Sequence, residues 1–241
     1  MTRSNTDFCN LVLFFTWDVS LELWEEKGLL QREILYYTRL AEQGVQVYLL
    51  TWGSQKDLEI ARRFHDNIQV IPLYCYIPAP KNKIFRAILS PLALWVARST
   101  LRRSNIIKTN QMWGGWIAVL AKFFFCKPLL VRTGFELYRF TCLQSKSLFR
   151  RVFMWGLSMA TYKSANLIYL ATEEDKDFVY RTFSIPRERI MTRPNWIDTE
   201  KFAPQTQIPS SSLNLSRILF VGRLNEQKNI PLLIEAVAGT E

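Results

Sequence analysis

The sequence predicts an α/β fold, in which a doubly wound parallel sheet is followed by the start of a second α/β domain. Short apolar runs alternate with amphipathic stretches of helical length, which is typical of strand, helix and strand units in a parallel sheet. The 241 residues are 49% hydrophobic, which is ample for a large core. In such a fold, ligands bind beyond the carboxyl ends of the strands.

Six apolar runs are the expected strands of the first domain, at 10–15, 45–51, 68–73, 105–110, 127–133 and 165–172. The stretch 29–44 is an expected helix, which Gly44 closes. Further helical stretches are expected between the strands, near 83–103, 112–125, 145–164 and 173–182.

A change in composition divides the chain. Residues 194–216 combine three prolines with a serine run and show no periodicity, as an interdomain linker does. We therefore expect an N-terminal Rossmann-like domain over 1–193 and the start of a second one over 217–241. In the second part, 217–222 is an expected strand and 229–239 an expected helix. A domain of this type needs about 100 to 150 residues, so the second is expected to be incomplete.

The net charge of +10 favours a polyanionic partner: phosphate groups, nucleic acid or an anionic membrane surface. The positive charge is the only feature that favours nucleic acid. Because no RNA- or DNA-binding motif accompanies it, we expect no nucleic-acid partner. The stretch 81–103 mixes basic residues with Ile, Leu and Trp95. It either lies on an anionic bilayer or packs an apolar face on the sheet with its cations in solvent.

Several classes of site and location are not expected. Four scattered cysteines and the single histidine, His65, indicate neither a metal site nor a disulfide framework. The N-terminus lacks the features of a signal peptide, and no apolar run reaches the roughly 18 to 20 residues of a membrane span. We therefore expect a cytoplasmic protein with reduced thiols, either free or peripheral on the cytoplasmic face of the membrane.

The most specific segment is 218–237, where a strand, a glycine turn, an arginine, a polar loop and a lysine precede a helix. A helix N-terminus favours an anion, and Gly222 lets the backbone approach it closely. Arg223 can donate to two phosphate oxygens and Lys228 adds a point charge. The segment therefore predicts a diphosphate site, with two solvated surface cations as the alternative.

Two motifs resemble those of the retaining glycosyltransferases of family 4, which have the two-domain GT-B fold. GRLNEQKN (222–229) resembles the donor-phosphate motif of that family, and PNWIDTEKFAP (194–204), with Asn195, is similar to the segment that leads into its second domain. The resemblance implies a nucleoside diphosphate sugar as donor and a lipid-linked or polysaccharide acceptor, with no cofactor or metal. It implies that Arg223 and Lys228 are catalytic because they neutralise the departing diphosphate, and that Gly222 and Asn229 also hold the donor.

The resemblance also implies acceptor-side candidates. Gly28 stands in the first loop, and Arg132 and Glu136 stand at the carboxyl end of an expected strand. The alternatives are an ordinary helix-entry glycine at Gly28 and an ion pair on a loop between Arg132 and Glu136.

The chain departs from the family pattern at several positions. Trp196 replaces a frequent glycine, no histidine follows the acceptor-side strand, and the paired glutamates of the family would lie beyond Glu241. We expect a transferase that is inactive as truncated; the alternative is a non-catalytic basic remnant that binds a membrane surface or an acceptor.

Overall fold

The computed structural model of the protein describes residues 9–203, 218–222, 224 and 228–238. The chain divides into two compact units, Met1–Asp198 and Thr199–Glu241.

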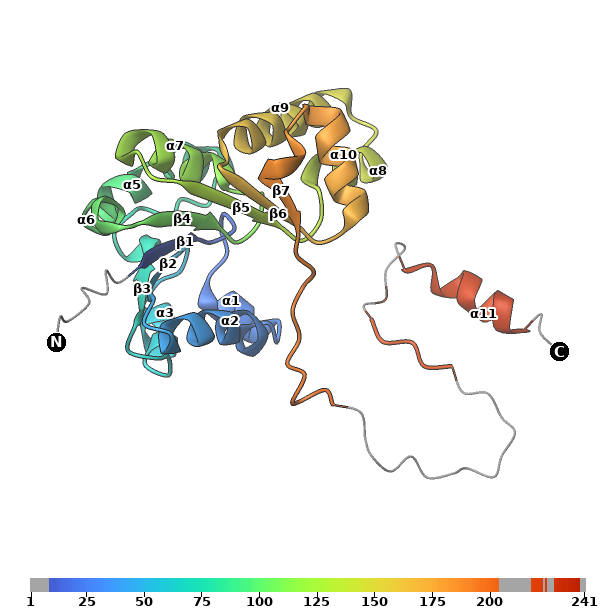
Figure 1. The fold of residues 1–241 in the computed structure, drawn as a ribbon, viewed down its shortest axis with the longest axis horizontal. Helices are drawn as coiled ribbons and strands as arrows, with labels where there is room; N and C mark the ends of the chain where they lie inside the picture. The colour runs from blue at the N-terminus through green and yellow to red at the C-terminus, as the bar shows by residue number, and fades with distance from the viewer. Residues whose placement is uncertain (1–8, 204–217, 223, 225–227, 239–241) are drawn as a thin grey trace. The chain divides into compact units, whose positions relative to one another are not determined.

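The first unit is built on one seven-stranded sheet whose strands are all parallel, in the order β3-β2-β1-β4-β5-β6-β7 (Figure 1). The strands are β1 (Asn10–Phe14), β2 (Gln46–Thr51), β3 (Ile68–Pro72), β4 (Ile106–Thr109), β5 (Leu129–Thr133), β6 (Leu167–Leu170) and β7 (Ile190–Thr192). The expected doubly wound α/β fold is confirmed, and all six expected strands are present. The seventh strand, β7, was not expected because three residues are too few to show a pattern.

Helices cover both faces of this sheet (Figure 1). One face carries α1 (Leu21–Glu26), α2 (Leu30–Glu42) and α3 (Gln55–Ala61). The opposite face carries α5 (Leu92–Val96), α6 (Arg98–Arg103), α7 (Gly115–Phe125), α8 (Leu137–Gln144), α9 (Leu148–Ser164) and α10 (Glu173–Phe183). Strand β1 is buried on both sides, since neighbouring Val12 and Leu13 are both fully covered, as a central parallel strand requires.

The expected helical stretch 83–103 is broken into three helices, α4 (Lys83–Leu89), α5 and α6. The break between the first two lies at Ser90 and Pro91, where proline cannot donate a backbone hydrogen bond. Three short helices were not expected, α1, α3 and α8, because segments of six to eight residues have too few turns to show periodicity.

The second unit contains one described helix, α11 (Ile230–Ala238), at the position where a helix was expected. Asn229 precedes it with a φ of 43°, in the left-handed region that asparagine tolerates. The strand expected at 217–222 is wrong for the described residues 218–222, which are irregular. A β-strand exists only through hydrogen bonds to a neighbouring strand, and no such neighbour is described in this unit.

Candidate functional site

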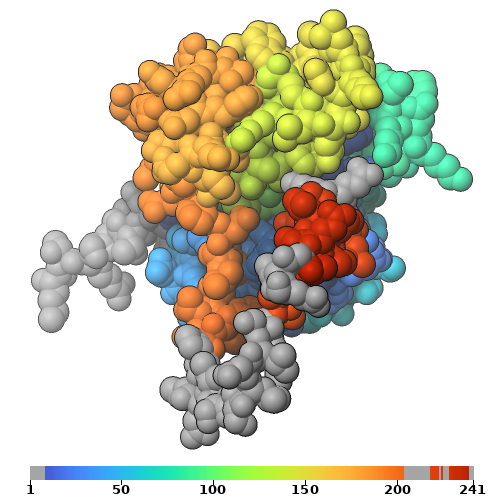
Figure 2. All heavy atoms as spheres, turned by 90° about the vertical axis from the view of Figure 1, so that its right-hand side faces the viewer, coloured from blue at the N-terminus to red at the C-terminus, as the bar shows by residue number. Residues whose placement is uncertain are grey.

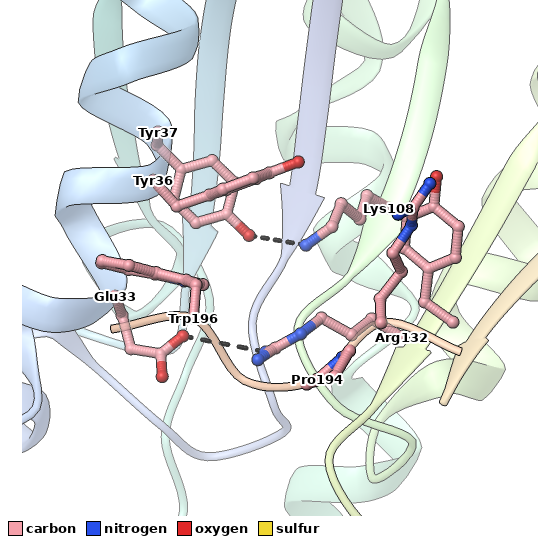
Figure 3. Close-up of a pocket in the computed structure, with 9 residues that line it drawn as sticks. Glu33, Tyr36, Tyr37, Lys108, Arg132, Pro194 and Trp196 are labelled. Carbon is pink, nitrogen blue, oxygen red and sulfur yellow. Dashed lines mark hydrogen bonds and ion pairs between the residues drawn. The ribbon is translucent and has the colours of Figure 1, made fainter. Parts of the chain in front are cut away.

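A cavity of about 400 Å³ lies in the first unit, between α2, the sheet and the segment after β7 (Figure 3). Its walls combine cationic, acidic and aromatic side chains: Glu33, Tyr36, Tyr37, Lys108, Arg132, Tyr169, Arg193, Pro194 and Trp196.

Strand register explains why residues from three strands meet here. Lys108 on β4 pairs with Leu130 on β5, two residues before Arg132. Arg132 in turn pairs with Tyr169 on β6. Because alternate residues of a strand share a face, the side chains of Lys108, Arg132 and Tyr169 all lie on the face that α2 covers.

Lys108 is the most deeply buried cation of the cavity. Only 5% of it is exposed, and its Nζ donates to the Tyr37 hydroxyl at 2.7 Å (Figure 3). The ammonium also lies 5.1 Å and 5.7 Å from the ring centroids of Tyr37 and Tyr36. Burial, with help from the charge of Arg132, lowers the pKa of Lys108 to about 7, although Glu33 opposes that shift. Lys108 can therefore hold or release a proton near neutral pH.

Glu33 is the carboxylate of the cavity, and two arginines share it. Arg32 lies 2.6 Å from one of its oxygens, and Arg132 lies 3.7 Å from the other. Arg132 also donates to the Oδ1 of Asn195 at 2.9 Å, which ties β5 to the segment that follows β7. The negative charge of Glu33 is thus already paired with two arginines.

Trp196 and Arg193 form the side of the cavity that follows β7. The Trp196 ring lies 6.5 Å from the Tyr36 ring, at an interplanar angle of 32°. The Arg193 guanidinium lies 5.9 Å from the centroid of the Tyr169 ring. No ion pair of Arg193 or Lys108 with a carboxylate within 4.0 Å is found among the described residues. The cavity therefore has an excess of positive charge next to aromatic rings.

The structure brings together two of the residues singled out in the sequence, Arg132 and Asn195. It places Glu136 elsewhere, as the N-cap of α8, where its carboxylate accepts from the Arg139 amide and from the Tyr162 hydroxyl. Burial raises the pKa of Glu136, and only 2% of the residue is exposed. Because Arg132 pairs with Glu33, the alternative of an ion pair with Glu136 on a loop is wrong.

Gly28 lies between α1 and α2 with a φ of 66°, and its amide donates to the Glu25 carbonyl at 3.0 Å. This is the backbone of a glycine that ends α1, one residue before Leu29, the N-cap of α2, so Gly28 also stands at the entry to a helix, and its acceptor role stays a prediction.

The donor-side candidates belong to the second unit. Arg223 lies outside the described residues, whereas Gly222, Lys228 and Asn229 are described and exposed. A Cβ at Gly222 would lie 2.9 Å from the Phe220 ring, so a side chain there would displace that ring. Lys228 comes two residues before α11, so it stands near the helix N-terminus.

Sequence reasoning missed the lining residues Glu33, Tyr36, Tyr37, Lys108, Tyr169 and Arg193. The usable signal was a charged residue inside an apolar strand, as Lys108 is in NIIKTN. A charge in a strand expected to be buried indicates a polar cavity or a partner.

The described residues contain neither a candidate metal site nor a candidate membrane span. No group of three or more His, Cys, Asp or Glu is placed to hold a metal ion in these parts of the chain. Of the described helices, none is long and apolar enough to cross a membrane.

The chain matches solved structures of other proteins. Sucrose-phosphate synthase from Thermosynechococcus elongatus matches with a TM-score of 0.69 at 17% identity, over 96% of this chain and 60% of that protein. Anabaena HepE in complex with UDP matches with a TM-score of 0.52 at 10% identity, over 82% of this chain and 47% of that one. A glycosyltransferase from Rickettsia africae matches with a TM-score of 0.50 at 13% identity, over 84% and 47%.

The fold is therefore an α/β fold of the Rossmann type, that of the N-terminal domain of GT-B glycosyltransferases. The model of Glycosyltransferase Family 4 matches residues 36–201, which is more than half of the chain, and the chain belongs to this family. It spans 47% to 60% of the length of these three solved structures. No curated protein sequence matches it significantly.

Proposed function

We propose that the chain serves the transfer of a sugar from a nucleoside diphosphate sugar to an acceptor, with retention of configuration. Membership of family 4 is the observation that carries this proposal. In this proposal, residues 1–193 form the acceptor-side domain, 194–216 form the linker and 217–241 form the start of the donor domain. The solved HepE structures, which hold UDP or UDP-glucose, support a nucleotide sugar as donor.

Arg223 and Lys228 are proposed to hold the donor diphosphate and to neutralise it as it leaves, with Gly222 and Asn229 shaping the loop. The described part of this loop supports the assignment, because exposed Lys228 stands just before α11, whose N-terminus favours an anion. Apolar Leu219 and Val221 are also exposed, as expected of a segment that packs on more of a donor domain. We therefore propose that the chain has little transfer activity by itself.

Calorimetry with UDP tests the donor side. We expect weak binding to the wild-type chain, and a loss of about tenfold in Arg223→Ala and in Lys228→Ala, since each removes a charged hydrogen bond. Arg181→Ala, on α10, is the control for the loss of one exposed positive charge. Unchanged affinity in both loop variants, or no affinity of the wild type, would contradict the donor assignment.

We also propose peripheral binding to an anionic membrane, which would suit a lipid-linked acceptor. The supporting observation is a set of large apolar residues on α4 and α5 whose exposed fractions range from 46% to 71%: Ile84, Phe85, Ile88, Leu92 and Trp95. Figure 2 shows this part of the chain, in teal at the right-hand edge, projecting beyond its neighbours. Lys81 and Lys83 lie beside these residues and supply the charge. Arg86, by contrast, faces inward to an ion pair with Asp18.

Sedimentation with vesicles tests this surface. Binding to vesicles rich in anionic lipid should exceed binding to zwitterionic vesicles, and the double change Phe85→Ser and Ile88→Ser should abolish it. Tyr180→Ser, which removes an exposed ring on α10, is the matched control. Equal binding of the double variant would refute the membrane proposal. Vesicle binding without any hydrolysis or transfer of a nucleotide sugar would favour the alternative of a non-catalytic membrane or acceptor-binding remnant.

A further inference from the structure

We infer that the cavity around Lys108 binds a sugar that carries a negatively charged group. The sugar part of this inference rests on the proposed function, whereas the anionic part rests on the cavity alone. Phosphate and carboxylate groups share the chemistry that the cavity offers, and the experiment below separates them.

The balance of charge in the cavity supports a ligand that bears a negative charge. Lys108, Arg132 and Arg193 line the cavity, against the single carboxylate of Glu33. That carboxylate is bound by Arg32 at 2.6 Å and by Arg132 at 3.7 Å. A negative group in the cavity would give Lys108 and Arg193 an anionic partner, which the described residues do not supply.

The donors that remain on Lys108 point to the same conclusion. One N–H of the ammonium is used by the Tyr37 hydroxyl, at 2.7 Å. The nearby rings of Tyr36 and Tyr37 offer only the weaker attraction of a cation for an aromatic face. A buried ammonium that makes one hydrogen bond leaves donors that an anion would satisfy.

The aromatic wall formed by Trp196 and Tyr36 supports a sugar as the ligand. Trp196 and Tyr36 have rings 6.5 Å apart and line the cavity together. Flat apolar faces suit the C–H face of a pyranose ring, while the charged groups opposite suit its substituent. The cavity volume of about 400 Å³ is within the ordinary range for a small-molecule site. Trp196 stands where the family often has glycine, so this wall is a feature of the present sequence.

Proton uptake should accompany binding. Burial lowers the pKa of Lys108 to about 7, and a bound anion would raise it again because an opposite charge favours the ammonium. The groups that face Lys108 come from α2 (Glu33, Tyr36 and Tyr37), from β5 (Arg132), from β6 (Tyr169) and from the segment after β7 (Arg193). A hexuronate should therefore bind up to about tenfold more tightly at pH 6 than at pH 8, a range in which its own carboxyl does not titrate.

Calorimetry on the 241-residue chain, without nucleotide, tests the inference with three probes: a hexose phosphate, a hexuronate and the parent neutral hexose. We expect at least one anionic probe to bind, and the neutral hexose to bind at least tenfold more weakly. The stronger of the two anionic probes identifies the group. Equal affinity for the neutral hexose, or no binding of either anion, would overturn the inference.

Three variants locate the binding. Lys108→Met and Arg193→Gln should each weaken the anionic probe by about tenfold or more, and Trp196→Ala by about two- to tenfold. Arg39→Gln is the matched control, because it removes an exposed cation that lies on α2 but does not line the cavity. Arg193 and Trp196 lie on the segment after β7, so their variants stay informative if Lys108→Met alters the core. Unchanged affinity in Arg193→Gln and Trp196→Ala would place the binding elsewhere and refute the assignment.

UDP binding separates this inference from the proposed function. UDP affinity should be the same in Lys108→Met as in the wild type, because the donor loop is a different site. If the wild-type chain binds UDP but neither anionic sugar, the cavity inference alone is refuted. If it binds an anionic sugar but not UDP, the donor assignment alone is refuted.

Discussion

Replacing Lys108 by methionine should change how stability depends on pH. The side chain is almost fully buried, so its charged form has lost its water in exchange for one hydrogen bond and two ring contacts. Methionine has a similar length and carries no charge, so its burial has no such desolvation cost. The variant is therefore expected to be more stable than the wild type at pH 7, even though the Tyr37 hydroxyl loses its partner at a cost of about 1 to 3 kcal/mol.

The magnitude follows from the pKa. Burial lowers the pKa of Lys108 from 10.5 to about 7 in the folded chain. Between these values the unfolded chain binds more protons than the folded one, so the stability of the wild type rises with pH, by up to about 1.4 kcal/mol per unit. Lys108→Met lacks this dependence. Its advantage should be greatest at or below pH 7, and should shrink by about 2 kcal/mol by pH 9.

Urea unfolding followed by tryptophan fluorescence measures this difference, since all eight tryptophans lie between residues 17 and 196, within the first unit. The unfolding free energies of the wild type and the variant are compared at each pH from 6 to 9. Lys163→Met, at an exposed lysine of α9, controls for the loss of one positive charge. A difference between Lys108→Met and the wild type that does not vary with pH would refute the reasoning.

Further substitutions test packing and capping. Gly53→Ala should lower the unfolding free energy by about 2 to 3 kcal/mol, because a Cβ there would clash with the buried Asp57 carboxylate. Gly156→Ala should raise it by about 0.5 to 1 kcal/mol, because a Cβ at this position of α9 meets open space. Thermal unfolding of the two variants measures both effects. Glu136→Ala should cost about 1 to 2 kcal/mol in urea unfolding through the lost cap, and an unchanged midpoint would contradict that role. Burial alone would raise the pKa of Asp18, but hydrogen bonds lower it; its stabilisation is thus present above its unfolded pKa of 3.8 and lost as pH falls through the folded value. Asp18→Asn should cost about 1 kcal/mol at pH 7 and progressively less in acid, as a pH series of melting temperatures would show.

The sheet was predictable because its strands are buried on both faces and so appear as continuous apolar runs, as in NLVLFF. Strand β7 was not, since a three-residue strand shows no pattern. Arg132 was found because the carboxyl end of a strand is where ligands bind in this fold. Lys108 was missed because its partners lie on α2, and which helix faces which strand is decided by tertiary packing. Arg223, the main donor candidate, lies outside the described residues, and its role stays a prediction.

The central position of β1 has a consequence for how the chain acquires its fold. This strand pairs with β2 on one side and with β4 on the other, and Asn10 reaches Asn105 and Arg103 through hydrogen bonds that span more than 90 residues. Closing so long a loop carries a large entropic cost before any contact compensates for it. During synthesis only β1, β2 and β3, three of the seven strands, can pair at first, and the β1 edge stays open until β4 (Ile106–Thr109) has emerged. That open edge is where aggregation of nascent chains is expected to begin.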